Sequence, residues 1–339
     1  MGNKYFGSVT MSIRIAGTGS YIPERILTNA DLEKMVDTND EWIVTRTGIS
    51  ERHIAAENEC TSDMAAAACR KALEAAGVDA KEVGAVIVAT CTPDYTFPGT
   101  AANIHRKLQM GKTFCFDLSA ACCGFLSALE VGCGIMLGNK KYRYVLVIGA
   151  EKLSSVVNWQ DRTTCVLFGD GAGAILLERV DDGNNTGLLA SDMNADGNWS
   201  EILKLPAGGS VHPASQATID AHMHTIHMQG QETFKLAVNA MVSACRTVEA
   251  EAGIDITKDV KLIIPHQANI RIIQAVAKRL GITEEQVICN ISRYGNTSAA
   301  SVAICFDEAV RTGRLQRGDL ALFASFGSGL VWGAQLVRY

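Results

Sequence analysis

Three side chains in this 339-residue sequence stand where acyl chemistry could be carried out: Cys122, His266 and Asn296. Cys122 follows small residues and lies at the predicted start of an apolar helix that runs from Phe125. A helix N-terminus carries partial positive charge, which lowers a thiol's pKa and favours a thiolate, and small neighbours leave room for a substrate. The pattern fits a nucleophilic cysteine about as well as a buried structural one, which is the more usual role of this residue type.

The other two side chains could stabilise negative charge. His266 follows a predicted strand over residues 261–264 and so lies at a strand end, where chemistry is commonly placed in α/β folds. Asn296 lies in the segment YGNTS, at the predicted start of another helix, where an N-cap role is the structural alternative. A neutral imidazole and an amide both donate hydrogen bonds, so together they could hold a thioester carbonyl while its oxygen becomes negative.

The chain resembles itself, which indicates how these side chains are positioned. Three pairs of segments occur in the same order in the two halves, and chance similarity between generic αβ units is the alternative. The first pair is a helix with a glycine C-cap followed by a strand, the second a glycine turn leading into a strand, and the third a small-residue turn that opens a helix. The pairs are 74–88 with 251–264, 168–179 with 326–338, and 117–129 with 290–302.

The alternation of helices and strands predicts a duplicated α/β fold. Near-continuous apolar strands, such as residues 85–89, are typical of central sheets covered by helices. We expect an N-terminal half over 1–180 and a C-terminal half over 181–339, divided at the polar, turn-rich segment 179–186. If the halves pack about a pseudo-twofold axis, their equivalent helix starts converge and form a composite site. Residues 204–220 are expected to form a surface loop.

Composition limits the possible partners. The net charge of −5 gives no overall positive field that would attract nucleic acid or an anionic membrane. The uninterrupted apolar stretches are far shorter than the roughly 18 residues that a membrane span requires, so no span is expected. Residues 1–11 lack the pattern of a signal peptide and form a leader of unknown role. We therefore expect a cytoplasmic protein that binds neither nucleic acid nor membrane.

The cysteines and histidines do not predict a metal or a disulfide framework. The 11 cysteines are odd in number and many lie inside apolar runs, as reduced thiols do. No Cys-x-x-Cys pair supports structural zinc, and the cluster of His212, His222, His224 and His227 lacks a completing carboxylate pattern. The glycine turns at 17–19 and 169–173 lack the full dinucleotide fingerprint, so NAD is not expected. We expect no cofactor and no metal.

Long motifs then resemble one known family. The segments DLSAACCGF, IIPHQANIRI, YGNTSAAS and FGSGLVWG, with an opening segment that begins GTGSYIPERILTN, resemble β-ketoacyl-[acyl carrier protein] synthase III of the thiolase superfamily. The resemblance covers essentially everything after Met11. It implies a duplicated five-layer αβαβα thiolase-like architecture with two pseudo-twofold-related halves, and a homodimer.

The resemblance also implies a reaction. An acyl-CoA, acetyl-CoA or another short starter, acylates Cys122, CoA leaves, and malonyl-acyl carrier protein enters. His266 and Asn296 stabilise the enolate formed on loss of CO2, and its attack on the acyl group gives a β-ketoacyl-carrier protein that initiates fatty acid synthesis. The backbone N–H groups of Cys122 and Ser328 would hold the acyl oxyanion; the family usually has glycine at the position of Ser328.

Further sites are implied by resemblance alone. Trp42, Arg46 and Arg162 match residues that bind CoA, the first two around its adenine. Phe97 matches a residue that reaches across the dimer to the floor of the partner's acyl pocket. Lys235, Arg271 and Lys278 match or adjoin positions that dock the acidic carrier protein.

Several other functions stay open at this level. A related starter enzyme of specialised polyketide or quinolone synthesis would keep the three catalytic side chains and change the acyl pocket. Thiolases and hydroxymethylglutaryl-CoA synthases use different partners of the cysteine, and Asn296 argues against both. A non-catalytic acyl-CoA-binding relative has no need for all three side chains. Reversible oxidation at the neighbouring Cys122 and Cys123 is a further possibility.

Overall fold

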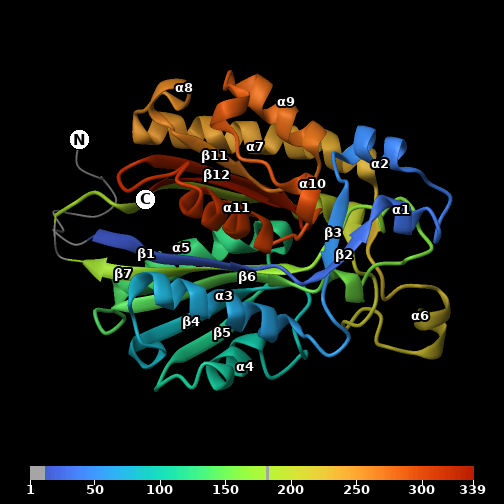
Figure 1. Ribbon diagram of the computed structural model, residues 1–339, viewed down its shortest axis with the longest axis horizontal. Coiled ribbons are helices and arrows are strands. Elements are labelled where there is room, and N and C mark those ends of the chain that lie inside the picture. The colour runs from blue at the N-terminus through green and yellow to red at the C-terminus, as the bar shows by residue number, and fades with distance from the viewer. Residues whose placement is uncertain (1–11, 181–182) are drawn as a thin grey trace.

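The computed structural model describes residues 12–180 and 183–339, which form two stacked sheets separated and covered by helices (Figure 1). The predicted leader, residues 1–11, lies outside the described residues. The first sheet has five strands in the order β1-β7-β6-β4-β5. These are β1 (Ser12–Tyr21), β7 (Gly171–Val180), β6 (Tyr144–Glu151), β4 (Val83–Ala89) and β5 (Phe114–Leu118). Strands β5, β4 and β6 are parallel, whereas β7 and β1 each pair antiparallel with their neighbours.

The second sheet repeats this order with four strands, β8-β13-β12-β11. These are β8 (Gly187–Ala195), β13 (Val331–Arg338), β12 (Leu320–Gly327) and β11 (Leu262–Pro265). Strand β11 is parallel to β12, and both β13 pairings are antiparallel. A parallel bridge from Ile263 to Val287 occupies the place that β5 has in the first sheet.

Helices form three layers around the two sheets (Figure 1). The outer layers contain α3 (Thr61–Ala76) and α4 (Thr100–Lys107) on one side and α7 (Gly230–Ala252) and α9 (Ile270–Leu280) on the other. The central layer contains α5 (Gly124–Gly138) and α11 (Ala300–Arg311). Alternate strand residues face the two sides: Ile87 packs with the central helices, whereas Val86 packs with α3. The predicted five-layer αβαβα architecture is confirmed.

Two of the three sequence repeats correspond to equivalent structure. Helices α3 and α7 both end at a left-handed glycine, Gly77 with φ +66° and Gly253 with φ +65°, before β4 and β11 respectively. Strands β7 and β13 occupy the same place in their sheets. All strands of the first sheet come from residues 12–180 and all strands of the second from 187–338. The division into halves 1–180 and 181–339 stays a prediction; residues 181 and 182, at their boundary, lie outside the described residues.

The third repeat is looser than expected. The first copy places η2 (Ala121–Cys123) directly before α5, whereas the second has the short helix α10 (Ile291–Tyr294) and then an extended segment before α11. Each central helix nevertheless follows a non-glycine residue with positive φ, Ala121 at +46° and Ser298 at +48°. Such backbone costs roughly 1–3 kcal/mol and clusters at functional sites.

Smaller elements connect these strands and helices. They are β2 (Arg25–Thr28), α1 (Asn29–Leu32), α2 (Asp40–Thr47), β3 (Glu51–Ile54), η1 (Ala80–Glu82), η3 (Leu153–Ser155), η4 (Gly197–Ile202), β9 (Leu203–Lys204), α6 (Gln216–Asp220), β10 (His227–Met228), α8 (Ile256–Asp259) and η5 (Glu284–Gln286). Residues 208–217 are exposed, as expected for most of the loop predicted over 204–220.

One helical stretch, Ala121–Gly138, is long and apolar enough to cross a membrane by length and composition alone. The sequence prediction concerned uninterrupted apolar stretches, and this helix does not contradict it, because several glycines, Ser127 and Glu130 interrupt the run. Half of the stretch is buried in the protein, where α5 lies in the central layer and Phe125, Leu126 and Met136 contribute to the core.

Candidate active site

Cys122 lies in the tight turn η2, where the end of β12 meets the start of α5. The hydroxyl of Ser325 in β12 donates to the Cys122 carbonyl at 2.8 Å. Gly327 allows the close approach, because a Cβ at this position would lie 2.7 Å from the Cys122 nitrogen. The second half of the chain therefore holds the nucleophile of the first half in place.

Cys122 is 9% exposed, and burial raises the pKa of its thiol to about 12. The negative charge of Glu151 also raises this pKa, whereas a hydrogen bond from Ser298 lowers it. The sequence expectation of a lowered pKa is therefore wrong for the free protein. Desolvation opposes the charged thiolate more strongly than its neighbours favour it. The resting thiol is protonated and must lose its proton during any attack.

His266 follows β11 directly and is 3% exposed. Burial lowers the pKa of its imidazole to about 3, so the ring is neutral. Its Nδ1 lies 2.7 Å from Ser301 Oγ, and that oxygen accepts a hydrogen bond from the Gln267 N–H at 3.4 Å. When the Ser301 hydroxyl donates to Nδ1, the proton of the neutral ring lies on Nε2. A neutral hydrogen-bond donor results, as the sequence argument assumed.

Asn296 lies in an extended segment before α11 and pairs with Phe168 of the first half. Its side-chain Oδ1 accepts from the Ser298 N–H at 2.8 Å, so the NH2 group is the end of the amide available as a donor. The N-cap of α11 is Ala299, with no side-chain cap bond. The N-cap interpretation of Asn296 is therefore wrong.

These three side chains line one cavity of about 450 Å³. Its walls are mostly apolar and come from both halves, with Leu153 and Phe168 on one side and Phe234, Met241 and Ile272 on the other. Cys123 is fully buried in the core between the sheets and does not line the cavity. The arrangement can hold an apolar acyl thioester next to a thiol and two neutral donors.

Ser328 lies at the end of β12 and also lines this cavity. Its φ is not positive, and the left-handed position of the turn is taken by Gly329 with φ +136°. The Ser328 hydroxyl hydrogen-bonds to the Leu203 carbonyl. The turn therefore accommodates serine at this position without needing the backbone freedom of glycine. The oxyanion role of the Ser328 N–H stays a prediction.

The three side chains implied in CoA binding are brought together on the surface. The Arg46 and Arg162 guanidinium carbons lie 6.0 Å and 5.3 Å from the centre of the Trp42 ring. Asn269, which lines the cavity, donates to the Arg46 carbonyl at 3.0 Å. The cluster of Trp42, Arg46 and Arg162 is thus linked to the cavity. A planar adenine could stack on the Trp42 indole in place of a guanidinium group.

The remaining implied residues lie at the surface. Phe97 is 85% exposed and does not line the cavity of its own chain. The guanidinium carbon of Arg271 lies 5.9 Å from the ring centre of Phe234, a cavity residue. Lys235 forms an ion pair with Glu232 at 3.3 Å, and Lys278 lies in the last turn of α9.

The histidine cluster forms no metal site within residues 12–180 and 183–339, where no group of three or more potential ligand side chains comes together. His224 contacts Thr218 Oγ1 at 2.9 Å, and His227 contacts the His222 carbonyl at 3.3 Å. These contacts belong to the surface segment around α6.

Three side chains at the site were missed in the sequence: Glu151, Ser298 and Ser301. Ser301 contacts His266, and Ser298 interacts with Cys122. Glu151 ends the apolar strand β6, so the strand-end rule that identified His266 could have identified it. The serines carried no signal of their own, because their role depends on where α11 packs.

Comparison with known proteins gives consistent matches along the chain. Residues 116–197 match the family model described as 3-oxoacyl-[acyl-carrier-protein (ACP)] synthase III, and residues 250–339 match the model of its C-terminal region. A β-ketoacyl-[acyl-carrier-protein] synthase III of Caldanaerobacter subterraneus is 50% identical over 325 residues, covering 96% of this chain and 97% of that protein.

Solved structures show the same similarity. The 3-oxoacyl-[acyl-carrier-protein] synthase III of Aquifex aeolicus superposes with a TM-score of 0.88 at 47% identity, covering 97% of this chain and all of that one. The priming β-ketosynthase of the R1128 polyketide pathway superposes with a TM-score of 0.87 at 35% identity, covering 96% of each chain.

Proposed function

This chain belongs to the β-ketoacyl-[acyl-carrier-protein] synthase III family of condensing acyltransferases, and we propose that it initiates fatty acid synthesis by joining an acyl group from acyl-CoA to malonyl-acyl carrier protein with loss of CO2. The observation that carries the proposal is that one apolar cavity holds the Cys122 thiol, the neutral His266 imidazole and the Asn296 amide. The reaction needs a nucleophile and two neutral donors, and the cavity supplies them.

In the first half-reaction, Cys122 sulfur attacks the acyl-CoA carbonyl. The carbonyl oxygen becomes negative and is held by the backbone N–H groups of Cys122 and Ser328. Collapse of this intermediate breaks the bond to the CoA sulfur and leaves an acyl group on Cys122. CoA departs before malonyl-carrier protein enters, which is a ping-pong order.

In the second half-reaction, His266 and Asn296 bind the thioester oxygen of the malonyl group. Loss of CO2 places negative charge on this oxygen. The two neutral side chains stabilise that charge by donating hydrogen bonds to the oxygen. The resulting carbanion attacks the acyl carbon on Cys122 and releases the β-ketoacyl-carrier protein. The pKa of His266, lowered to about 3, supports a role as donor rather than as cationic acid.

The binding surfaces are proposed on less direct grounds. Trp42 with Arg46 and Arg162 would bind the CoA nucleotide, and Arg271, Lys235 and Lys278 would meet the acidic carrier protein. Phe97, exposed in the single chain, would close the acyl pocket of a second subunit in a homodimer. We propose no cofactor and no metal, since acyl-CoA is a substrate.

A starter enzyme of polyketide or quinolone synthesis is the second candidate. It is favoured by the likeness to a priming β-ketosynthase at 35% identity. The two functions share the three catalytic side chains and differ in the acyl donor. The acyl chain that loads fastest therefore distinguishes them.

The test is acyl loading followed by intact-mass measurement. The protein is incubated with a panel of acyl-CoAs, the adduct is mapped to a peptide, and Cys122→Ala is the control. Malonyl-acyl carrier protein is then added. An adduct on Cys122 that disappears as β-ketoacyl-carrier protein forms supports the proposal and names the starter, whereas absence of any adduct from the whole panel contradicts it.

A further inference from the structure

A buried carboxylate next to the nucleophile has no part in the mechanism so far. Glu151 is 0% exposed and ends β6 beside Cys122. Its Oε2 accepts hydrogen bonds from the hydroxyls of Thr92 at 2.6 Å and Thr90 at 3.2 Å. The backbone N–H groups of Cys91 and Thr92 donate to the same carboxylate at 3.1 Å. Burying a carboxylate is costly, and this one is provided with several donors.

Ser298 connects this carboxylate with Cys122. Strand β6 packs against the start of α11, where Gly149 lies against Ala299, and Ser298 lines the catalytic cavity together with Cys122. From this position the Ser298 hydroxyl can hydrogen-bond to both groups, which partly offsets the rise that burial causes in the pKa of Glu151 and of the Cys122 thiol. Ser298 also has a φ of +48°, a left-handed conformation that serine rarely adopts. Strain of this kind is kept where the surrounding structure requires the side chain at one place.

The surroundings of Glu151 contain no cation in contact within residues 12–180 and 183–339. The titratable groups that interact with it are the thiols of Cys91 and Cys122, and the other contacts are neutral hydroxyls and backbone. Lys152, the next residue, donates instead to the carbonyls of Ala56 and Glu59. Burial raises the pKa of Glu151 to about 7, so near neutral pH the carboxylate can both accept and return a proton.

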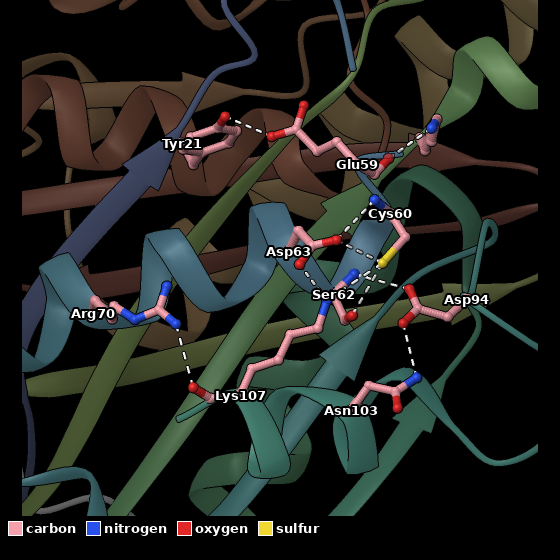
Figure 2. Close-up of polar contacts among 10 residues, drawn as sticks. Tyr21, Glu59, Cys60, Ser62, Asp63, Arg70, Asp94, Asn103 and Lys107 are labelled. Atoms are coloured by element: carbon pink, nitrogen blue, oxygen red, sulfur yellow. Dashed lines mark hydrogen bonds and ion pairs between the residues drawn. The ribbon is translucent and has the colours of Figure 1, made fainter. Parts of the chain in front are cut away.

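The loop that holds Glu151 is anchored from outside the site. The Thr61 hydroxyl donates to the Thr92 carbonyl at 2.5 Å. Asp94 of the same loop accepts hydrogen bonds from the Ser62 N–H at 2.9 Å and from the Asn103 amide at 2.8 Å, and these residues are drawn in Figure 2. Helices α3 and α4 thus fix the donors around the carboxylate before any substrate binds.

We propose that Ser298 and Glu151 form a proton relay for acylation of Cys122, which rests on the proposed function. As the sulfur bonds to the acyl carbon, the thiol proton passes to Ser298 Oγ and the serine's own hydrogen passes to the Glu151 carboxylate. When the carbon–sulfur bond to CoA breaks, the proton returns by the same path to the departing thiolate. The products are acyl-Cys122 and CoA thiol, with Ser298 and Glu151 restored. Ser298 is the catalytic residue here and Glu151 acts through it.

The experiment measures the acylation rate of Cys122 against pH by quenched intact-mass analysis. The donor is an acyl-N-acetylcysteamine thioester, which has no phosphate to titrate. For the wild type we expect the rate to rise through an inflection near the pKa of Glu151, about 7. His266, with a pKa of about 3, cannot produce it. Glu151→Gln and Ser298→Ala should lower the rate by about 100-fold and remove the inflection.

Two further variants separate a relay from a structural role. Thr90→Val removes one donor to the carboxylate and should move the inflection up by about half a pH unit, because the ionised form loses a hydrogen bond. Glu178→Gln makes the same carboxyl-to-amide change near the far end of β7 and should leave the profile unaltered. Malonyl decarboxylation, measured in every variant, shows whether His266 and Asn296 remain in place.

The outcomes distinguish the relay from the proposed function. If Glu151→Gln acylates within about threefold of the wild type, or keeps the inflection, the relay is refuted and the proposed function stands. If Glu151→Gln also loses malonyl decarboxylation, the substitution has disrupted the whole site. The relay is then judged from the other two variants: it is refuted if Thr90→Val leaves the inflection in place and Ser298→Ala keeps the wild-type acylation rate. If the wild-type Cys122 is never acylated by this donor or by any acyl-CoA, both proposals fall.

Discussion

Replacing Gly149 with alanine should separate the two halves of the active site. Gly149 lies in β6, where the strand passes the start of α11. A Cβ at Gly149 would lie 2.3 Å from the Ala299 carbonyl oxygen and 2.7 Å from its carbon. The φ of Gly149 is not in the left-handed region, so only space opposes the substitution. Since the obstacle is backbone, no side chain can rotate away, and α11 must shift.

The expected cost follows from that contact. Adding a methyl group to a well-packed core costs typically about 1–3 kcal/mol, and a rigid obstacle favours the upper part of this range. Asn296 and Ser298 precede α11 and would move with it. We therefore expect a lower free energy of unfolding together with a loss of condensation activity. The matched control is Gly134 inside α5, where an added Cβ would meet no neighbouring atom within 4 Å.

The assay is urea unfolding followed by circular dichroism at one fixed protein concentration. Gly134→Ala should raise the free energy of unfolding by about 0.5–1 kcal/mol, because alanine is the better helix former. Gly149→Ala should lower the free energy of unfolding, with acyl loading and condensation measured on the same samples. A Gly149→Ala protein within about 0.5 kcal/mol of the wild type would refute the packing argument. So would equal losses in both variants.

Four further predictions concern the proposed site. Asn296→Asp keeps an acceptor for the Ser298 N–H but removes the NH2 donor, so CO2 release from malonyl-carrier protein should fall about 100- to 1000-fold while Cys122 acylation continues; unchanged CO2 release contradicts the role. Because burial lowers the pKa of His266 from 6.5 to about 3, the unfolded state binds more protons between these values. Stability should therefore fall as pH drops from 6.5 towards 3, and the urea midpoint of His266→Gln should fall less steeply. Trp42→Ala should raise KM about 10-fold or more for acyl-CoA, and an equal rise for the N-acetylcysteamine thioester would exclude adenine stacking. Arg271→Glu should raise KM for malonyl-carrier protein about 10-fold at low salt, with acyl-CoA loading as the reference; unaltered kinetics would remove Arg271 from the docking surface.

The local sequence pattern was enough to predict sheets covered by helices and to name the three central side chains as candidates. The resemblance of longer motifs to the synthase III family then selected their roles. Apolar strands such as β4 and β6 cannot be exposed on either face, which requires sheets covered by helices. The helix ends at Gly77 and Gly253 mark the repeated unit, since glycine accepts the left-handed cap readily. Cys122, His266 and Asn296 lie in segments whose local pattern places them at turns and strand ends.

The protonation states and the partners of those side chains depend on the tertiary structure instead. The pKa of Cys122 is raised and that of His266 lowered by burial, and burial results from packing the two halves together. Ser298 meets Glu151 and Cys122 across more than 100 positions of the chain, because α11 packs against the first sheet. Desolvation and contacts between distant segments arise only in the folded chain, so no local pattern could reveal them.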